Sequence, residues 1–520
     1  MTDRHREYHV CGPPGTGKTT WVAKQAKRAV EKHGAERVMI LSLTKAAARA
    51  IGERDTGLSA DRMGTMHSFC FHLLGTPKLM GKKEVETWNK EHPHWALSPA
   101  VLGTSGGWLD PGADIFSSVY QTVDRKRHKL DEPLTSYESE FLGAFTFWKR
   151  EHGFYDFTQL IEDVLHQRRT PDPQPAVLIA DEYQDLSNLE LSVLRLWGDE
   201  ADDLVMVGDF AQSVYDFHGA SRAYAERVPD VVLEQSHRVP RRVWDVAKRL
   251  LDRMSKKPSA YLKPREEEGE FQYGPSLKFP EFYLNEIASR PDESFMFIAS
   301  CGYMLNALID RLRMEGIPYW NPYAPTEGRW NPLKLNIDGK TTTPQRVLAY
   351  LNGSNEWTVG EFKLWQPLFV GIWKRGFNNA IELLRDDDPW SILSALLKEI
   401  TKPEAMTDIL TRQPNVLLRY AAAKYEKTLT YLVRLIELNG KEVLEKEPRI
   451  LLGTIHSVKG GEADNVIVFP DLSPSWFELM QQDGWEGRDS VLRLFYVALT
   501  RARKRLIVGD PATRFYMEGL

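Results

Sequence analysis

Short runs of apolar residues recur along this chain, and segments with helical spacing separate them. The runs are His9–Cys11, Val38–Leu41, Ala176–Ala180, Leu204–Val207, Phe295–Ala299, Ile450–Leu452, Val466–Phe469 and Leu506–Val508. Continuous apolar runs are typical of parallel strands that are buried on both faces. The pattern therefore predicts an α/β chain built around parallel sheets.

The strand–helix alternation is interrupted twice. It stops from about Gly75 to Arg150, where one helix carries Phe141, Phe145 and Trp148 on a single face. It stops again between Trp320 and Glu447, where apolar spacing predicts one helix from Leu418 to Ile436 with a stop at Asn439-Gly440. A last helix is predicted from Ser490 to Lys504. The sequence thus predicts two α/β units, each split by an insertion.

These interruptions set the expected domain boundaries. Residues 1–74 and 151–232 form the first α/β domain, and residues 75–150 form its mainly helical insertion. Residues 233–322 and 449–520 form the second α/β domain, and residues 323–448 form its mainly helical insertion. A chain of 520 residues is too long for one core, which fits three or four domains.

Composition narrows the class of protein further. No apolar run approaches the roughly 18 residues of a membrane span, and the polar N-terminus is no secretory signal. The three cysteines form neither a C-x-x-C pair nor a zinc spacing, so we expect a cytoplasmic protein without membrane contact. The net charge of −5 does not favour a nucleic-acid binder, but local basic patches matter more than the sum.

A glycine-rich loop follows the first apolar run and precedes a helical segment. It fits G-x-x-x-x-G-K-[ST], the phosphate loop, whose backbone N–H groups converge on phosphate oxygens. Lys18 is expected to reach the β- and γ-phosphates, and the Thr19 hydroxyl is expected to bind Mg²⁺. The predicted nucleotide-binding residues are Gly12, Pro13, Pro14, Gly15, Thr16, Gly17, Lys18, Thr19 and Thr20.

Two adjacent acids, Asp181 and Glu182, end a predicted buried strand. Ligands bind at the carboxyl ends of strands in parallel sheets, so these acids are placed for nucleotide chemistry. Asp181 is expected to hold Mg²⁺, and Glu182 is expected to act as the general base. The competing interpretation is a solvated acidic turn, which the phosphate loop upstream disfavours.

Seven motifs, in order, resemble those of UvrD/Rep/PcrA-type superfamily 1 helicases. They are GPPGTGKTT at 12–20, GTMHS at 64–68, DEYQD at 181–185, GDFAQSVYDFHGA at 208–220, LEQSHR at 233–238, TIHSVKGGE at 454–462 and YVALTRA at 496–502. They span nearly the whole chain, whereas the two insertions match by position only. The resemblance implies two RecA-like motor domains that face each other across an ATP cleft.

The resemblance also assigns roles to residues at matching positions. Gln212 resembles the glutamine that senses the γ-phosphate and couples it to DNA. Arg238 and Arg501 resemble arginines that close on the γ-phosphate, and Glu462 resembles a glutamate near the ribose. Together with Lys18 and Glu182, residues Gln212, Arg238 and Arg501 are the expected catalytic set, with ATP and Mg²⁺ as cofactors.

Further positions resemble those that line a single-strand path. They are Thr44, Thr65, His67, Tyr215, Phe217, His456, Ser457 and Lys459. Tyr215 and Phe217 are implied to stack on bases, although Phe217 also fits a core aromatic. The basic run Arg125–Lys129 either touches duplex phosphates or forms a solvated face, and it is not included in the site.

Several positions depart from the family pattern. Leu43 stands where relatives often have phenylalanine, His218 stands where they have arginine, and His237 stands where they have a tyrosine near the base. No counterpart of the upstream adenine-reading element is found, so selectivity for ATP over other triphosphates is not predicted. We also expect no room for an appended nuclease domain after Val508.

The resemblance implies an ATP-dependent helicase that moves 3′ to 5′ on single-stranded DNA and unwinds duplex, in repair, replication or recombination. Single strands and their junctions with duplex are the expected partners, with a monomer in isolation and no identified loading partner. Three alternatives stay open: a translocase that separates duplex poorly, an RNA-directed motor, and a nucleotide-gated DNA-binding subunit of a repair or defence complex.

Overall fold

The structure is a computed structural model, and it divides into two compact units. It describes residues 6–43, 48, 51–97, 119–215, 227–258, 260–322, 327–337, 339–352, 356–482 and 484–520. The first unit comprises residues 1–274, 299–303 and 454–520, and the second comprises residues 275–298 and 304–453. The phosphate loop, the acid pair and the C-terminal motifs therefore all belong to the first unit.

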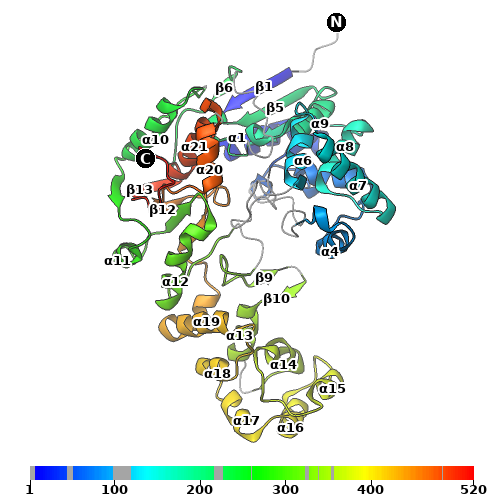
Figure 1. Ribbon diagram of the computed structural model, residues 1–520, viewed down its shortest axis with the longest axis vertical. Helices are drawn as coiled ribbons and strands as arrows, with labels where there is room; N and C mark the ends of the chain where they lie inside the picture. Colours follow the sequence, from blue (N-terminus) through cyan, green and yellow to red (C-terminus); the bar gives the residue numbers. More distant parts are fainter. Residues whose placement is uncertain are drawn as a thin grey trace. The chain divides into compact units, whose positions relative to one another are not determined.

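A six-stranded sheet forms the centre of the first unit (Figure 1). Its strands are β1 (Arg6–Cys11), β2 (Val38–Leu41), β3 (Met63–Gly64), β4 (Val177–Asp181), β5 (Asp203–Gly208) and β6 (Val231–Val232). The strand order is β3-β2-β4-β5-β1-β6, and the paired strands run parallel. All of β2 and β4 is buried, as their continuous apolar runs predicted.

Helices pack against this sheet and close its core. They are α1 (Lys18–His33), α3 (Met66–Leu73), α8 (Phe157–His166) and α9 (Asn188–Gly198). Ser187 starts α9 with a capping box, because its hydroxyl accepts from the Glu190 N–H while Glu190 accepts from the Ser187 N–H. Leu178, Met206 and Trp197 belong to one buried cluster that joins β4, β5 and α9.

The segment of the chain between β3 and β4 has a hydrophobic core of its own. Its described helices are α4 (Lys82–Glu91), α6 (Val119–Lys129) and α7 (Ser136–His152). Trp88, Phe141, Phe145 and Trp148 are buried together, so the three aromatic residues predicted on one face of α7 do share a core. Trp88 meets Phe145 edge-to-face at 5.1 Å between ring centroids.

The basic run Arg125–Lys129 is not the uniform solvated or phosphate-facing surface that the sequence suggested. Arg127 is buried, and its guanidinium donates to Asp156 at 3.1 Å and to Glu162 at 2.6 Å. The buried carboxylate of Asp156, at the start of α8, and the half-buried carboxylate of Glu162 on α8 therefore hold Arg127 inside the protein. His128 is also buried, with Nδ1 2.9 Å from the Ser187 hydroxyl.

The C-terminal part of the chain adds a second set of parallel strands to the first unit. These are β7 (Glu270–Gly274), β12 (Ala463–Val468) and β13 (Ala502–Gly509), and β13 pairs with both neighbours. The helices here are α10 (Arg241–Arg253), α20 (Pro474–Gln482) and α21 (Gly484–Leu499). The prediction of a helix through Lys504 is wrong, since residues from Ala502 onward form the paired strand β13.

Among the described residues, the second unit carries four further strands and most of the remaining helices, drawn in green to orange in Figure 1. Its strands are β8 (Phe295–Ala299), β9 (Asn336–Ile337), β10 (Lys340–Thr341) and β11 (Ile450–Thr454). Its helices are α11 (Pro280–Ser289), α12 (Asn306–Met314), α13 (Thr343–Asn352), α14 (Val359–Trp365), α15 (Phe377–Glu382), α16 (Trp390–Ile400), α17 (Pro403–Leu410), α18 (Pro414–Arg419) and α19 (Glu426–Asn439). The helical character of this region agrees with its apolar spacing.

The single helix predicted from Leu418 to Ile436 is wrong. The chain leaves α18 after Arg419 and re-enters a helix only at Glu426. Between them, the Tyr420 carbonyl accepts from the Val370 N–H at 2.9 Å, and the Ala422 N–H donates to the Leu368 carbonyl at 2.8 Å. These distant backbone partners replace helical hydrogen bonds. The predicted stop is confirmed, because Gly440 caps α19 with φ of 77°.

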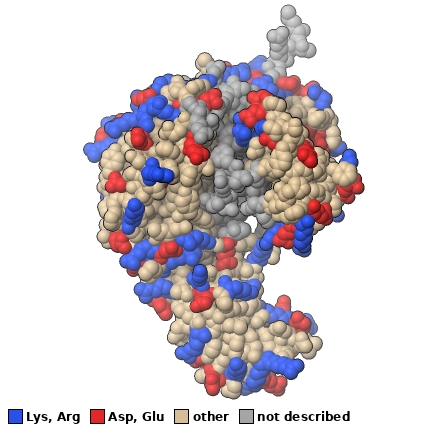
Figure 2. Space-filling model, viewed as in Figure 1, with Lys and Arg blue, Asp and Glu red and all other residues tan. Residues whose placement is uncertain are grey.

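The predicted α/β class with parallel sheets is confirmed. Among the described residues, no helix combines the length and apolar character needed to cross a membrane. Lys and Arg side chains are intermixed with Asp and Glu over the face shown in Figure 2, in keeping with the small net charge of −5.

Candidate nucleotide site

The phosphate loop connects β1 to α1, and two of its glycines are required by geometry. Gly17 has φ of 82° at the N-cap of α1, a backbone conformation that L side chains disfavour. At Gly12, an added Cβ would lie 2.3 Å from Lys18 Cγ. The loop is therefore wound closely around Lys18, and it ends at the N-terminus of α1, a position at which anions bind in proteins.

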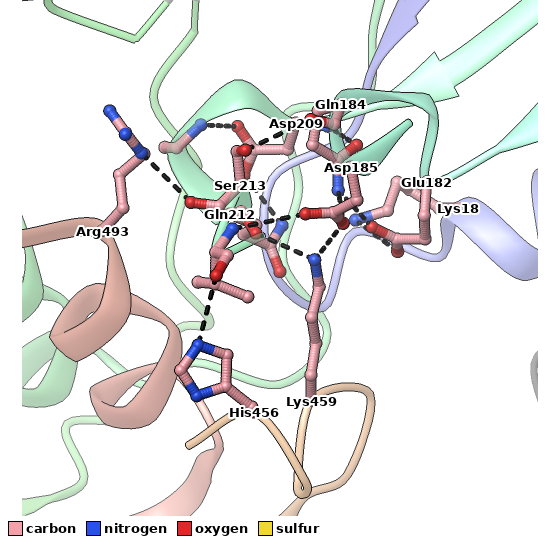
Figure 3. Close-up of polar contacts among 12 residues, drawn as sticks. Lys18, Glu182, Gln184, Asp185, Asp209, Gln212, Ser213, His456, Lys459 and Arg493 are labelled. Carbon is pink, nitrogen blue, oxygen red and sulfur yellow. Dashed lines mark hydrogen bonds and ion pairs between the residues drawn. The ribbon is translucent and has the colours of Figure 1, made fainter. Parts of the chain in front are cut away.

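Lys18 occupies the space inside the loop. Its Nζ donates to the Gly12 carbonyl at 2.8 Å and lies 3.6 Å from a Glu182 carboxylate oxygen (Figure 3). The ammonium thus sits between the loop and Glu182.

Asp181 and Glu182 are adjacent, but their pKa values shift in opposite directions. Burial raises the pKa of Asp181, and the neighbouring Glu182 charge raises it further. Burial also favours a higher pKa for Glu182, but Lys18, Lys459, Gln184 and Arg501 together hold its pKa below the usual range. Glu182 also has φ of 55°, a strained conformation for a non-glycine residue. The arrangement keeps Glu182 ionised at neutral pH, as a general base must be.

The residues at this point fit a magnesium ion. Asp181 Oδ1 is buried and has no hydrogen-bond partner among the described residues. An unsatisfied buried carboxylate oxygen is costly unless a cation or donor reaches it. Carboxylate and hydroxyl oxygens are suitable Mg²⁺ ligands, and Thr19 supplies the hydroxyl at the start of α1. Across the described residues, this site included, no group of three or more His, Cys, Asp or Glu side chains is arranged to hold a metal.

The Gln212 side chain contacts Asp209 on one side and Arg501 on the other. Its Nε2 donates to Asp209 at 2.8 Å, and its Oε1 accepts from Arg501 Nη2 at 3.2 Å. Arg501 is buried and also donates to the Val497 carbonyl at 2.8 Å. Gln212, predicted to sense the γ-phosphate, is thus in direct contact with Arg501, predicted to close on it.

Arg238 and Glu462, both predicted near the nucleotide, pair with each other. Arg238 Nε donates to Glu462 at 2.6 Å. The backbone before Arg238 lies against the phosphate loop, because the His237 N–H donates to the Gly15 carbonyl at 2.8 Å and the Ser236 hydroxyl donates to the Pro14 carbonyl at 2.9 Å. An added Cβ at Gly15 would lie 2.5 Å from Arg238 Cβ. His237 itself is exposed.

Lys459 points toward the acid side of the site. Its ammonium forms an ion pair with Asp185 and donates to the Gln212 carbonyl at 2.9 Å (Figure 3). Burial raises the pKa of Asp185 to about 6, and Lys459 opposes that rise. The structure therefore places Lys459 in contact with the DEYQD box rather than on an open surface.

The other predicted single-strand residues near Lys459 are also largely buried. His456 Nε2 lies 3.1 Å from the Val214 carbonyl, and its ring lies between those of Tyr215 and Trp476, at 5.9 and 5.8 Å between centroids. Burial lowers the pKa of His456 to about 4. The Ser457 hydroxyl donates to the Thr454 carbonyl at 3.0 Å. These side chains connect the motifs to one another in this structure.

Thr65 and His67 lie at the start of α3. Thr65 is its N-cap, since its hydroxyl accepts from the Ser68 N–H at 3.2 Å. His67 is half-buried, its ring lies 5.7 Å from that of Phe157, and burial lowers its pKa to about 4. Thr44 and Phe217 lie outside the described residues.

Sequence reasoning missed several residues that connect the site. The Gln184 side-chain Nε2 donates to Glu182 at 2.5 Å and to Asp185 at 2.9 Å, and its Oε1 accepts from the Asp209 N–H at 2.9 Å. Gln184, Asp185 and Asp209 stand inside the quoted motifs, so the motifs themselves were the signal. Arg493, which donates to the Ser213 carbonyl at 3.1 Å, lies outside them and had no sequence signal.

Comparison with known proteins identifies two families. The family described as "AAA domain" matches residues 2–218, and the family described as "UvrD-like helicase C-terminal domain" matches residues 395–510. The first match contains the phosphate loop and the acid pair. The second contains Lys459, Glu462 and Arg501.

Three relatives carry the similarity further. The "ATP-dependent DNA helicase UvrD2" of Mycobacterium bovis is 26% identical over 371 residues, 65% of this chain and 47% of the relative, so the chain spans about half of that protein. The "Probable DNA helicase II homolog" of Mycoplasma genitalium is 20% identical over 98% of this chain and 84% of its own length. The "ATP-dependent DNA helicase PcrA" of Staphylococcus aureus is 20% identical over 96% of this chain and 80% of its own length.

Proposed function

Because this chain belongs to the UvrD-like superfamily 1 helicases, we propose that it is an ATP-driven motor that moves 3′ to 5′ along single-stranded DNA and unwinds duplex. Its pathway is DNA repair, replication or recombination. The observation that carries the proposal is the contact between Gln212 and Arg501 beside the phosphate loop and the acid pair. In the proposed division into two motors, Gln212 is a sensor on the first motor and Arg501 is an arginine on the second, so this contact supports one shared nucleotide site.

In the proposed reaction, each residue acts on ATP according to its position. The loop N–H groups and Lys18 bind the phosphates, and Glu182 accepts the proton of the attacking water. Arg501 and Arg238 stabilise charge on the γ-phosphoryl group, an effect worth roughly 10³–10⁵ in rate for one such arginine. Asp181 and Thr19 would hold Mg²⁺, which neutralises phosphate charge when bound.

Contact with DNA is assigned to the described residues Thr65, His67, Tyr215, His456, Ser457 and Lys459, together with Thr44 and Phe217. Stacking of a base on an aromatic ring contributes about 1–3 kcal/mol without sequence preference. The Tyr215 and His456 rings are in contact. A shift of Tyr215 when DNA binds would therefore displace His456 and the loop that also carries Lys459. We also propose the division into motor domains 1–74 with 151–232 and 233–322 with 449–520, each with its insertion, and a monomer in isolation.

Two substitutions test the chemistry. Lys18→Ala and Glu182→Gln should each abolish DNA-stimulated ATP hydrolysis, because they remove the phosphate-binding ammonium and the general base. Lys27→Ala is the matched control, since Lys27 also lies on α1 but pairs with exposed Asp55. Normal hydrolysis by either site variant would refute the assigned roles.

Polarity and substrate are tested with tailed duplexes. We expect the protein with ATP to unwind DNA duplex from a 3′ tail and not from a 5′ tail. Unwinding only from 5′ tails would contradict the polarity. Activity confined to RNA duplexes, or translocation without strand separation, would replace the helicase assignment with one of the other motor functions. ATP-dependent binding without turnover would indicate a nucleotide-gated binding subunit.

A further inference from the structure

Three consecutive backbone carbonyls, those of Gln212, Ser213 and Val214, are each held by a side chain from the C-terminal part of the chain. Lys459 donates to the first at 2.9 Å, Arg493 Nε donates to the second at 3.1 Å, and His456 Nε2 lies 3.1 Å from the third (Figure 3). We call residues 212–214 the strap. All the residues involved belong to the first compact unit.

The strap is held by two different elements. Lys459 and His456 come from the turn that follows β11, whereas Arg493 comes from α21. Ser213 has φ of −70° and ψ of 116°, an extended conformation in which successive carbonyls point to opposite sides. The turn therefore binds the first and third carbonyls, and α21 binds the middle one.

The two ends of the strap reach the two proposed functions. At its start, the Gln212 side chain contacts Arg501 and Asp209 in the nucleotide site. At its end, the chain continues into Tyr215, whose ring lies 5.3 Å from the Lys459 ammonium. A shift of the strap would thus move the nucleotide sensor and the proposed base-stacking residue together.

Arg493 is placed to set the position of the strap. It is 3% exposed, its guanidinium lies 4.9 Å from the centre of the Phe210 ring, and Nη2 donates to the Ser490 hydroxyl at 3.0 Å. A buried guanidinium is retained only when its donors are well used. Here Nε donates to the main-chain carbonyl of Ser213. The contact therefore fixes the backbone at position 213 and does not depend on the side chain there.

We propose that Arg493 is a positioning residue that holds the strap from the α21 side, so that nucleotide binding at Gln212 and DNA binding at Tyr215 act on each other. This inference rests on the proposed motor function. Arg493 touches neither ligand in this role; it acts through the Ser213 carbonyl. Without it the Ser213 carbonyl loses its hydrogen bond from α21, and DNA accelerates hydrolysis much less.

The test compares ATP hydrolysis with and without oligodeoxythymidine for four proteins: the unaltered chain, Arg493→Met, Arg493→Lys and Ser490→Ala. Met keeps an apolar stem against Phe210 but has no donor, and Lys restores one donor. Ser490→Ala removes the hydrogen bond from Arg493 to Ser490 and leaves the one to the Ser213 carbonyl, so it is the matched control.

We expect Arg493→Met to reduce the maximal stimulation by DNA at least about tenfold, because it deletes a charge-assisted hydrogen bond to a buried carbonyl. Hydrolysis without DNA and the DNA concentration for half-maximal effect should change by less than about threefold, a split that loss of folding would not produce. Arg493→Lys should recover most of the stimulation, and Ser490→Ala should keep it.

Three results would overturn the inference. Stimulation of Arg493→Met within about twofold of the unaltered chain would show that the Ser213 contact does not couple the sites. An equal loss in Ser490→Ala would assign the effect to packing of α21. If DNA does not stimulate ATP hydrolysis by the unaltered chain, both the proposed motor function and this inference are overturned. The first two results, by contrast, would overturn the inference alone.

Discussion

The ion pair between Lys459 and Asp185 predicts a pH-dependent loss of stability when Lys459 is replaced by methionine. The Lys459 side chain is 11% exposed, and the Asp185 carboxylate is fully enclosed. Methionine keeps the apolar stem but removes the charge. It leaves Asp185 with the Val214 N–H at 3.2 Å and the Gln184 amide at 2.9 Å as hydrogen-bond donors. The carboxylate then lacks a counter-charge in a site that water does not reach.

The direction of the effect follows from the pKa of Asp185. Burial raises it from 3.8 to about 6 although Lys459 opposes the rise. A carboxyl whose folded pKa exceeds its unfolded pKa loses stability as pH rises between the two values, and the loss is complete above the higher value. Removing Lys459 raises the folded pKa further, so the variant should go on losing stability above pH 6, where the unaltered chain has levelled off.

The size of the difference can be bounded. At pH 8 the unaltered chain carries a penalty of about 3 kcal/mol for ionised Asp185, from the two-unit rise at 1.36 kcal/mol per unit. In the variant, protonation limits the penalty at pH 8 to about 6 kcal/mol, so the difference reaches at most about 3 kcal/mol. At pH 5 the carboxyl is protonated in both folded proteins, and the pH-dependent difference falls to about zero.

Thermal unfolding of the two proteins between pH 5 and pH 8 measures this difference. The gap between their midpoints should widen by roughly 5 °C from pH 5 to pH 8. Lys248→Met is the matched control, because Lys248 pairs with Asp252 at a half-exposed site and should show no such widening. A gap that stays constant across this pH range would refute the claim that Lys459 neutralises a buried Asp185 carboxylate.

Two further substitutions test the loop and the first insertion. Gly15→Ala should destabilise the chain by at least about 1 kcal/mol more than Gly17→Ala, because both have positive φ but only the Gly15 Cβ would meet Arg238, 2.5 Å away; equal melting midpoints would contradict this. Arg127→Met should cost about 3–5 kcal/mol by leaving buried Asp156 and Glu162 without their guanidinium, whereas exposed Arg241→Met should cost under about 0.5 kcal/mol; a melting curve unchanged in Arg127→Met would contradict the buried pairing.

The strands were predictable because burial of both faces leaves a local trace. The runs Val177–Ala180 and Leu204–Val207 are apolar at every position. Each run forms a strand with site residues at its carboxyl end. The break between α18 and α19 left no such trace. Its apolar spacing suits a continuous helix, and only the distant backbone of residues 368–370 draws its hydrogen bonds away.

The candidate site was predictable where motif and chemistry coincide. The motifs include Lys18, Glu182, Gln212 and Arg501, and the structure brings these four close together. The motifs did not predict the ion pair between Lys459 and Asp185, although both residues belong to motifs. A motif records which residue types occur in order, whereas ion pairing across 274 positions depends on how the chain packs.

Arg493 shows a more general reason for such a miss. Motif reasoning matches a side chain to a ligand or to another side chain, but Arg493 binds a main-chain carbonyl, which every residue possesses. The partner position therefore places no demand on residue type, and no pairing pattern can arise in the sequence. A main-chain carbonyl is present whatever residue stands at position 213. The contact therefore leaves no pattern in the sequence, and it also tolerates substitution at that position. If the strap couples nucleotide to DNA, substitution at Arg493 should matter far more than substitution at Ser213, whose own hydroxyl donates elsewhere, to the Gln184 carbonyl at 3.1 Å.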